Sequence, residues 1–443
     1  MTSVATAAPA VERWQAAFEL LEAARREPER LAALRRSAMA RFSEAGFPSP
    51  KSEAWKFTNP APLTAKPFGE APQVEVSAAQ VAPFLYPGCA ALVFVNGRYA
   101  PGLSRLESLP EALLAGSLRE AVAERPARIA ELGVHADFVG QPLTALNTAL
   151  FEDGALLWAP KGVVIETPIQ ILYLSAGAGE PFAVFPRTLL VAGEASQLTV
   201  IETYAALGES LYWTCAVTEI VAGDNAHLDH YKSQRESLRG LHTAAQETVL
   251  GRGAQVSSHA FSLGAALARH DVHGVLGGEG ADANLNGLYM VRGEQHSDTH
   301  MKVDHRAAHC SSHELYKGVL DGRARGVFDG LIHVHPGAQK TDAKQTNRNL
   351  LLSRDALVNT NPQLLIFADD VKCTHGSTVG ELDQDAVFYL RSRGIGVEAA
   401  TSLLTYAFAH DIIERIRVEP LRHDLESFLF AWLPKGEVVA QAV

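Results

Sequence analysis

A cysteine and a histidine two residues apart are the pair of side chains in this sequence that is best suited to metal chemistry. Cys373 and His375 closely follow the apolar run Leu364–Phe367. If the extended backbone of that run continues, both side chains point to the same face. Thiolate and imidazole are both competent ligands for iron, and the adjacent Lys372 would favour the thiolate form.

This pair is incomplete as a metal site, because one cysteine and one histidine cannot hold a cluster alone. A second chain would have to supply the remaining ligands. The alternative is that Cys373 is a buried thiol and His375 an unrelated surface side chain. The spacing by itself favours that alternative, so the pair needs support from its surroundings.

A second group of candidate ligands is a run of histidines around one cysteine, Cys310. The histidines are His296, His300, His305, His309 and His313. On a helix, the last three would share a face and could bind zinc or iron. On a strand, positions four apart lie about 13 Å from each other, too far for one ion. Because β-type sequence surrounds the run, we expect a hydrogen-bonded histidine ladder, with a metal site as the alternative.

His333 and His335 are a further pair two residues apart, the spacing seen in cupin-type metal sites. Such sites need a third ligand a few residues on, and Gly337–Lys340 offers none. The run Gly337–Thr341 superficially resembles the end of a phosphate-binding loop, but the full spacing of that loop is absent. We therefore expect no nucleotide hydrolysis by this chain, and ATP only through a partner subunit.

Composition limits the classes of protein to consider. The chain has 443 residues, of which 47% are hydrophobic and 20% charged, with a formal net charge of −11. This balance is typical of a globular protein and argues against binding to nucleic acid or anionic membrane. Four widely spaced cysteines predict neither a disulfide framework nor a zinc ribbon. No secretory signal or membrane span is recognisable, so we expect a cytoplasmic location.

The elements that position these residues change character along the chain. Residues 1–150 read as an N-terminal helical region with an extended connector, whose helices could cap an adjoining fold. From Phe151 the helical periodicity disappears, and short β-rich runs alternate with turns. A turn pattern recurs with its alanines 31, 28 and 27 residues apart, at Ala195, Ala226, Ala254 and Ala281. A near-fixed period predicts stacked units, hence a mainly β fold with a parallel β-helix over residues 151–395. A large β-sandwich is the alternative.

Residues 396–443 return to helical periodicity. Two amphipathic segments, broken at Pro420, each carry one apolar stripe. These helices either pack on the β-helix or dock a partner. The end coils of a solenoid leave strand edges unpaired, and such edges must be capped or used for pairing.

Several sequence words between residues 297 and 394 resemble the SufB/SufD family of the SUF iron–sulfur cluster assembly system. They are Thr299–Met301, Tyr316–Leu320, Gly337–Ala343, Asn347–Leu352, Ala368–Cys373 and Phe388–Ile395. Weaker matches upstream are Glu53–Thr58, Phe94–Arg98 and Leu146–Ala149. His375 is similar to the SufD side of the family, since SufB carries Arg-Cys-Asp-Ser at this word. Leu365 departs from the acidic residue of many SufD proteins.

The resemblance implies a right-handed parallel β-helix between N-terminal and C-terminal α-helical regions. It implies a non-catalytic scaffold that pairs with SufB and docks the SufC ATPase through residues 396–443. A nascent iron–sulfur cluster or iron would be held at the SufB–SufD interface, with His375 as ligand and Cys373 as auxiliary thiol. Reduced flavin is associated with complexes of this family, although this chain has no dinucleotide-binding fingerprint.

Two other interpretations are kept open. One is a histidine-rich metalloenzyme built on residues 296–335. The other is an interaction module in which Cys373 and His375 have no metal role. We also expect that the isolated chain can form a homodimer.

Overall fold

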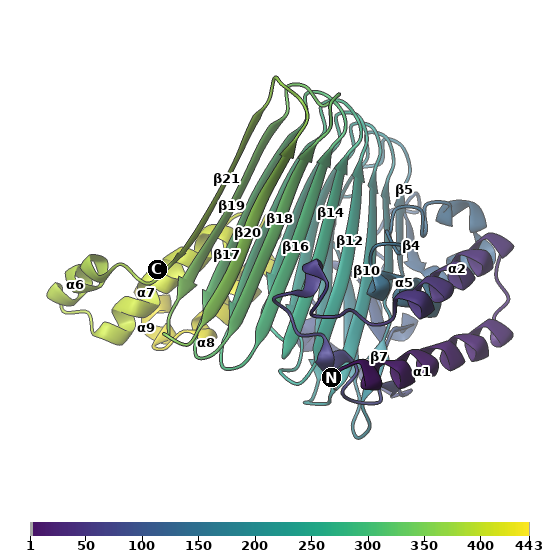
Figure 1. Cartoon of the computed structure of the whole chain (residues 1–443), viewed down its shortest axis with the longest axis horizontal. Helices are drawn as coiled ribbons and strands as arrows, with labels where there is room; N and C mark the ends of the chain where they lie inside the picture. Colours follow the sequence, from purple (N-terminus) through teal and green to yellow (C-terminus); the bar gives the residue numbers. More distant parts are fainter. Residues whose placement is uncertain (1–2, 443) are drawn as a thin grey trace.

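Two parallel β-sheets face each other across one long core in the computed structural model, which describes residues 3–442 (Figure 1). Sheet A contains, in spatial order, β20 (Leu357–Ile366), β18 (Arg325–Val334), β16 (His296–His305), β14 (Leu267–Leu276), β12 (Leu241–Leu250), β10 (Tyr212–Ala222), β8 (Arg187–Ala192), β5 (Gly154–Ala159) and β4 (Leu114–Ser117), with β7 (Phe182–Val184) beside β10 and β1 (Gly69–Glu70) beside β7. Sheet B contains β21 (Lys372–Gly380), β19 (Asp342–Leu351), β17 (Ser311–Leu320), β15 (Asp282–Val291), β13 (Gln255–Ser262), β11 (His227–Arg235), β9 (Gln197–Leu207), β6 (Ile169–Ala176), β2 (Ala90–Val95) and β3 (Arg98–Tyr99).

The chain alternates between the two sheets, so each pair of strands forms one coil of a solenoid. Strands of sheet B from β9 onward begin at residues 197, 227, 255, 282, 311, 342 and 372, which gives a period of 27 to 31 residues. Two positions before each of these strands up to β19, one residue has a positive φ: Ala195, Asn225, Gly253, Gly280, His309 and Lys340. The sequence period therefore reflects one tight left-handed turn position per coil.

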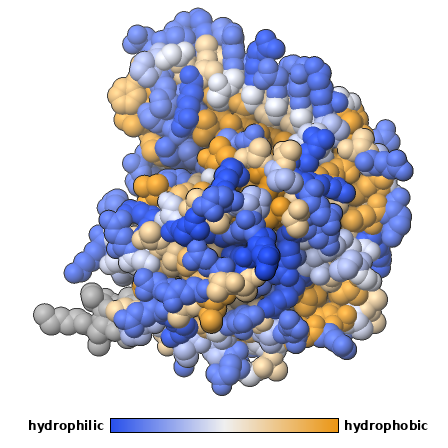
Figure 2. Space-filling model, turned by 90° about the vertical axis from the view of Figure 1, so that its right-hand side faces the viewer, coloured by the Kyte–Doolittle hydropathy of each residue, from blue (hydrophilic) through white to orange (hydrophobic). Residues whose placement is uncertain are grey.

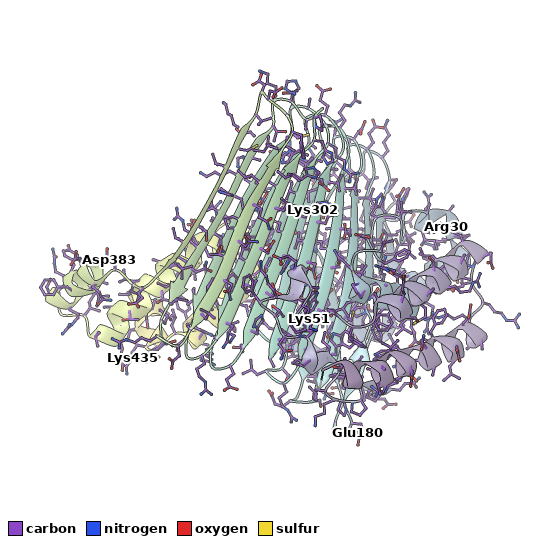
Figure 3. All side chains as sticks on the ribbon, viewed as in Figure 1. Arg30, Lys51, Glu180, Lys302, Asp383 and Lys435 are labelled. Carbon is purple, nitrogen blue, oxygen red and sulfur yellow. The ribbon has the colours of Figure 1, made fainter. Side chains whose placement is uncertain are left out.

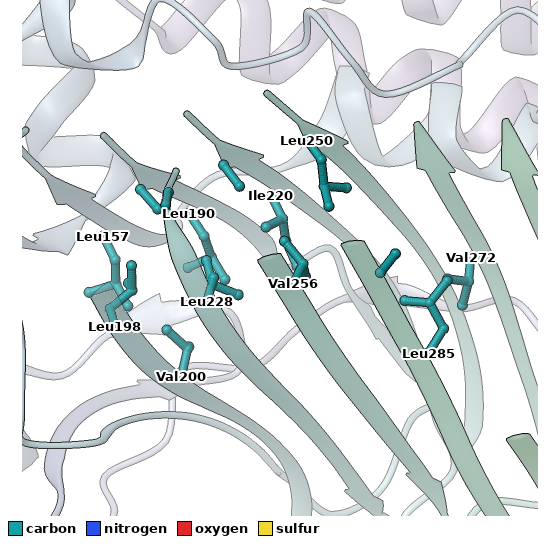
Figure 4. Packing of buried hydrophobic residues seen from close by; sticks show 14 of the residues in the cluster. Leu157, Leu190, Leu198, Val200, Ile220, Leu228, Leu250, Val256, Val272 and Leu285 are labelled. Carbon is teal, nitrogen blue, oxygen red and sulfur yellow. The ribbon is translucent and has the colours of Figure 1, made fainter. Parts of the chain in front are cut away.

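The core lies between the sheets and is built from aliphatic side chains stacked coil upon coil (Figure 4). Leu198, Leu228 and Val256 occupy equivalent positions in successive coils and are each at most 2% exposed. Strand side chains alternate between the two faces, so the other half of each strand points outward from the solenoid. Those outward faces are where the helices pack.

The N-terminal helices cover part of the outer face of sheet A. They are α1 (Ser3–Ala24), α2 (Glu29–Ala45), α4 (Leu118–Glu124) and α5 (Pro142–Leu150), whereas the short α3 (Ala78–Val81) packs on β2 and β6 of sheet B. Trp14, Phe42 and Leu146 form one apolar cluster with Trp213 of β10 and Leu241 of β12. We expected these helices to cap an end of the solenoid; the apolar stripe of α1 and α2 instead faces the side of sheet A.

The C-terminal helices cover the outer face of sheet B. The helices of this region are α6 (Gln384–Ser392), α7 (Val397–Ile413), α8 (Glu419–Trp432) and α9 (Gly436–Ala442), of which α7 to α9 pack on sheet B. Ile412 and Leu425 are at most 1% exposed and share a cluster with Tyr231, Phe261 and other outward-facing residues of sheet B. The apolar stripes of α7 and α8 are therefore largely used in packing on the solenoid. Helix α6 projects away from the body (Figure 1).

The two ends of the solenoid differ. At the N-terminal end, each sheet finishes in a short antiparallel strand, β3 against β2 and β4 against β5. Hydrophilic side chains predominate on this side of the molecule (Figure 2). At the C-terminal end, β20 and β21 are the last strands of their sheets, and within residues 3–442 each has a strand partner on one side only. This leaves an open coil edge.

The predicted mainly β fold with a parallel solenoid and helices at both termini is confirmed. Strands β2 and β4 lie before residue 151 yet pair with β6 and β5. The proposed division of the chain at residues 150 and 395 stays a prediction. All four cysteines are free thiols, as expected. Among the helices in the described part of the chain, none is long and apolar enough to cross a membrane.

Candidate functional site

Cys373 and His375 lie on β21, the last strand of sheet B. In the parallel pairing with β19, Cys373 is opposite Ala343 and His375 is opposite Gln345. Both partners are buried, which identifies this alternate set of positions as inward-facing. The two candidate ligands thus share a face, as expected, with Cα atoms about 7 Å apart. They face the space between the sheets at the open end of the solenoid.

Cys373 is half-buried against a small apolar cluster. Its neighbours in that cluster include Ile332 of β18 and Leu364 of β20. Burial, followed by the negative charge of Asp342, raises the pKa of the Cys373 thiol. This is opposite to the effect that we expected from Lys372, whose side chain is exposed. In the isolated chain Cys373 therefore favours the neutral thiol, and coordination of a metal would be needed to remove its proton.

His375 continues a column of polar side chains that runs inside the solenoid. Glu314 of β17, Gln345 of β19 and His375 occupy equivalent positions in successive coils. Gln345 Nε2 donates a 2.6 Å hydrogen bond to Glu314 Oε2. Burial raises the pKa of Glu314 to about 7. His375 is exposed because no further coil covers it.

The histidines between 296 and 313 are not gathered into one site. His296 Nε2 lies 2.8 Å from Thr58 Oγ1, and His300 Nε2 lies 3.1 Å from Asp298 Oδ1. His305 is buried inside the solenoid, 3.0 Å from Ser312 Oγ. His309 is the left-handed residue of a turn, and His313 is exposed on β17. Each of the first three has its own polar partner, so the run does not form the expected histidine ladder.

His333 and His335, in contrast, do meet a third candidate ligand, which the sequence reasoning missed. Asp304 of β16 is opposite His333 of β18 on the outer face of sheet A. Ligand atoms of Asp304, His333 and His335 all lie within 4.8 Å of one another. A cupin-type site would have its third ligand within Gly337–Lys340. Asp304 instead lies 29 residues before His333. That separation is one coil, so the solenoid period was the signal that could have identified it.

Comparison with known proteins agrees with the family resemblance of the short motifs between residues 297 and 394. Residues 173–408 match the family described as SUF system FeS cluster assembly, SufBD core domain. Residues 14–171 match the SufBD protein N-terminal region. The chain belongs to the SufB/SufD family.

Curated relatives extend this assignment along most of the chain. The iron–sulfur cluster assembly protein SufD of Escherichia coli is 33% identical over 98% of this chain and 100% of its own length. An iron–sulfur cluster assembly SufBD family protein of Synechocystis is 35% identical over 85% of each chain. The SufD protein of Bacillus subtilis is 29% identical over 65% of this chain and 66% of its own length. The expected family is thus confirmed, and with it a role in iron–sulfur cluster assembly.

Proposed function

We propose that this protein is a SufD-type scaffold subunit that pairs with a SufB-type paralogue through its open C-terminal coil. A nascent cluster or iron, as substrate, would be held between the two chains with His375 and Cys373 as ligands. The observation that carries this proposal is the position of both residues on β21, in the last coil, where among the described residues β20 and β21 each have a strand partner on one side only.

The open coil has the chemical character of a pairing surface. Ile366 is 39% exposed although its partner Val334 is completely buried, and Val379 is 45% exposed. Leu365 and Phe367 add further exposed apolar area, at 42% and 55%. An unpaired strand edge with apolar side chains favours the addition of another β-structure. A paralogue with the same solenoid fold would continue both sheets.

The end coil is held in shape without a partner. Thr360 of β20 and Ser377 of β21 are joined by a 2.7 Å hydrogen bond between their hydroxyl oxygens. Cys373 packs with Leu364, which ties the two last strands together. The candidate ligands are therefore presented on strands that are fixed before pairing. Preorganised ligands of this kind reduce the entropic cost of binding.

The chain's own contribution to cluster assembly would be to bind and position. A thiol and an imidazole supply two ligands, and a cluster needs more. The SufB-type partner would supply the others. ATP would act only through a SufC-type ATPase docked on the C-terminal helices, and the electron source, for which reduced flavin is a candidate, stays a prediction.

Replacing the exposed imidazole tests the proposed site. In the reconstituted complex with SufB-type and SufC-type subunits, we expect His375→Ala to reduce cluster yield at least tenfold while the complex still assembles. His313→Ala is the matched control, because His313 is also exposed on a strand of sheet B. The measurement is anaerobic absorption and Mössbauer spectroscopy of the cluster, with size-exclusion chromatography for assembly. Equal cluster yields in wild type and His375→Ala would exclude His375 as a ligand.

A further inference from the structure

We propose that Asp304, His333 and His335 form a binding site for one divalent transition-metal ion, of the Zn²⁺ or Fe²⁺ class, on the outer face of sheet A. This site differs from the Cys373/His375 pair in strand, sheet and face. Its residues come from β16, β18 and the turn that follows β18. It is independent of the proposed scaffold function.

The three ligands have the spacing that a metal ion requires. Asp304 Oδ1 lies 2.8 Å from His333 Nδ1 and 3.5 Å from His335 Nε2. A metal bonded at about 2.1 Å to each ligand would hold neighbouring ligand atoms about 3.0 to 3.4 Å apart, in octahedral or tetrahedral geometry. The observed distances bracket this interval, so small rotations of the side chains suffice.

The donor set selects a particular class of ion. Two imidazole nitrogens and one carboxylate oxygen are the ligands of many zinc sites and of the facial triad of non-haem Fe²⁺. His335 Nε2 is buried and has no hydrogen-bond partner among the described residues. Its partner would then be the bound ion. Three protein ligands leave further coordination positions open to water.

Asp304 is held in the orientation that this site needs. Its side chain is only 1% exposed, and its second oxygen, Oδ2, lies 2.8 Å from His273 Nε2. His273 Nδ1 in turn lies 2.8 Å from Glu247 Oε2. The two oxygens of the Asp304 carboxylate thus have different partners. His273 holds Oδ2, and Oδ1 is directed toward His333 and His335. Outer residues that fix a ligand in this way typically strengthen metal binding tenfold or more.

The long cationic side chains of Lys302 and Arg306 lie beside the site and oppose metal binding. Lys302 Nζ lies 2.8 Å from Asp304 Oδ2, and Arg306 Nη2 lies 3.7 Å from the same oxygen. Both side chains are about half exposed, at 45% and 54%, so each can turn into solvent. Figure 3 shows Lys302 on the broad face of the strands, between the two groups of helices. The site is therefore accessible from outside.

Aromatic rings pack around the site. The rings of His333 and His335 have centroids 4.0 Å apart, and Phe367 packs edge-on to His333 at 5.8 Å. Phe367 directly follows β20 of the last coil. A metal at this place would tie the β16 coil to the β18 coil, one step before the open end.

The test is metal binding by the full-length, tag-free chain after chelator treatment. Its background variant is Cys373→Ser/His375→Ala, so that the proposed cluster ligands do not contribute. We expect one Zn²⁺ per chain by isothermal titration, and one Fe²⁺ in a parallel anaerobic arm. Comparison of the two arms distinguishes the ions. Co²⁺ should give an absorption spectrum of nitrogen and oxygen ligation.

Three variants connect the binding to the proposed ligands. His333→Ala and the more conservative His335→Gln should each weaken Zn²⁺ binding at least tenfold, whereas the matched control His309→Ala should not. Lys302→Gln should tighten binding severalfold, because it removes a competing cation. Thermal unfolding without metal checks that each variant is folded. Absence of stoichiometric binding, or equal binding by wild type and His335→Gln, would overturn the proposal without affecting the test of His375.

Discussion

Residue chemistry in this protein depends on stacking between coils more than on neighbours in sequence. Cys373 and His375 were recognisable because two residues on one strand share a face. Asp304 was not, since it meets His333 only through strand pairing across one coil. The same is true of Cys373, whose pKa is raised by burial and by Asp342 rather than lowered by Lys372. Local spacing could predict shared faces, but not the charges contributed by adjacent coils.

Glu314 offers a stability prediction at this scale. Burial raises its pKa from 4.5 to about 7 in the folded chain. Folding therefore retains a proton that the unfolded chain loses, so stability falls as pH rises from 4.5 to 7 and is constant above that range. The full cost is about 3 kcal/mol. We expect Glu314→Gln to abolish this loss, because its amide can still accept from Gln345.

The measurement for Glu314 is denaturant unfolding at pH 5 and pH 8. Glu314→Gln should exceed wild type in free energy of unfolding at pH 8 and approach it at pH 5. Glu75→Gln, a change at an exposed glutamate, is the matched control. If wild type and Glu314→Gln show the same pH dependence, the carboxyl group of Glu314 is ionised in the folded state.

The helices and strands could be predicted from periodic patterns in the sequence. How these elements pack on one another could not be predicted from those patterns. The period of about 28 residues identified the solenoid because successive coils from β9 to β19 share the same left-handed turn position. The stripes on α7 and α8 predicted helices, yet the choice between packing and docking needed the structure. Ile412 and Leu425 are buried against sheet B. The proposed docking of an ATPase would then use surface that α7 and α8 leave exposed, or the neighbouring helix α6.

Helix α6 is the element to test for ATPase docking. Phe388 is 70% exposed and Tyr389 is 56% exposed, although both are large and apolar. We expect Phe388→Ser/Tyr389→Ser to weaken co-purification of the SufC-type subunit at least tenfold, since few intramolecular contacts are lost. Leu238→Ser, which changes a residue that is 53% exposed in a loop, serves as control. Undiminished retention of the ATPase by the double variant would place the docking surface elsewhere.

At the scale of the whole molecule, part of the solenoid surface is covered by the chain's own strands and helices, and part is left exposed. Short antiparallel strands close the N-terminal end, α5 and its neighbours cover part of sheet A, and α7 to α9 cover sheet B. The open end and part of sheet A remain (Figure 1). The sequence indicated that end coils need capping or pairing. Which end stays open could not be predicted, because β3 and β4 are too short to be recognised.

Hydrogen–deuterium exchange of the chain, alone and with the SufB-type partner, tests the central claim that the open coil is the pairing surface. The account predicts that protection on mixing concentrates in β20 and β21, including the amides of Cys373 and His375. Strands β2 to β5 at the opposite end should exchange as before. Protection at that N-terminal end, with no change in residues 357–380, would contradict the account.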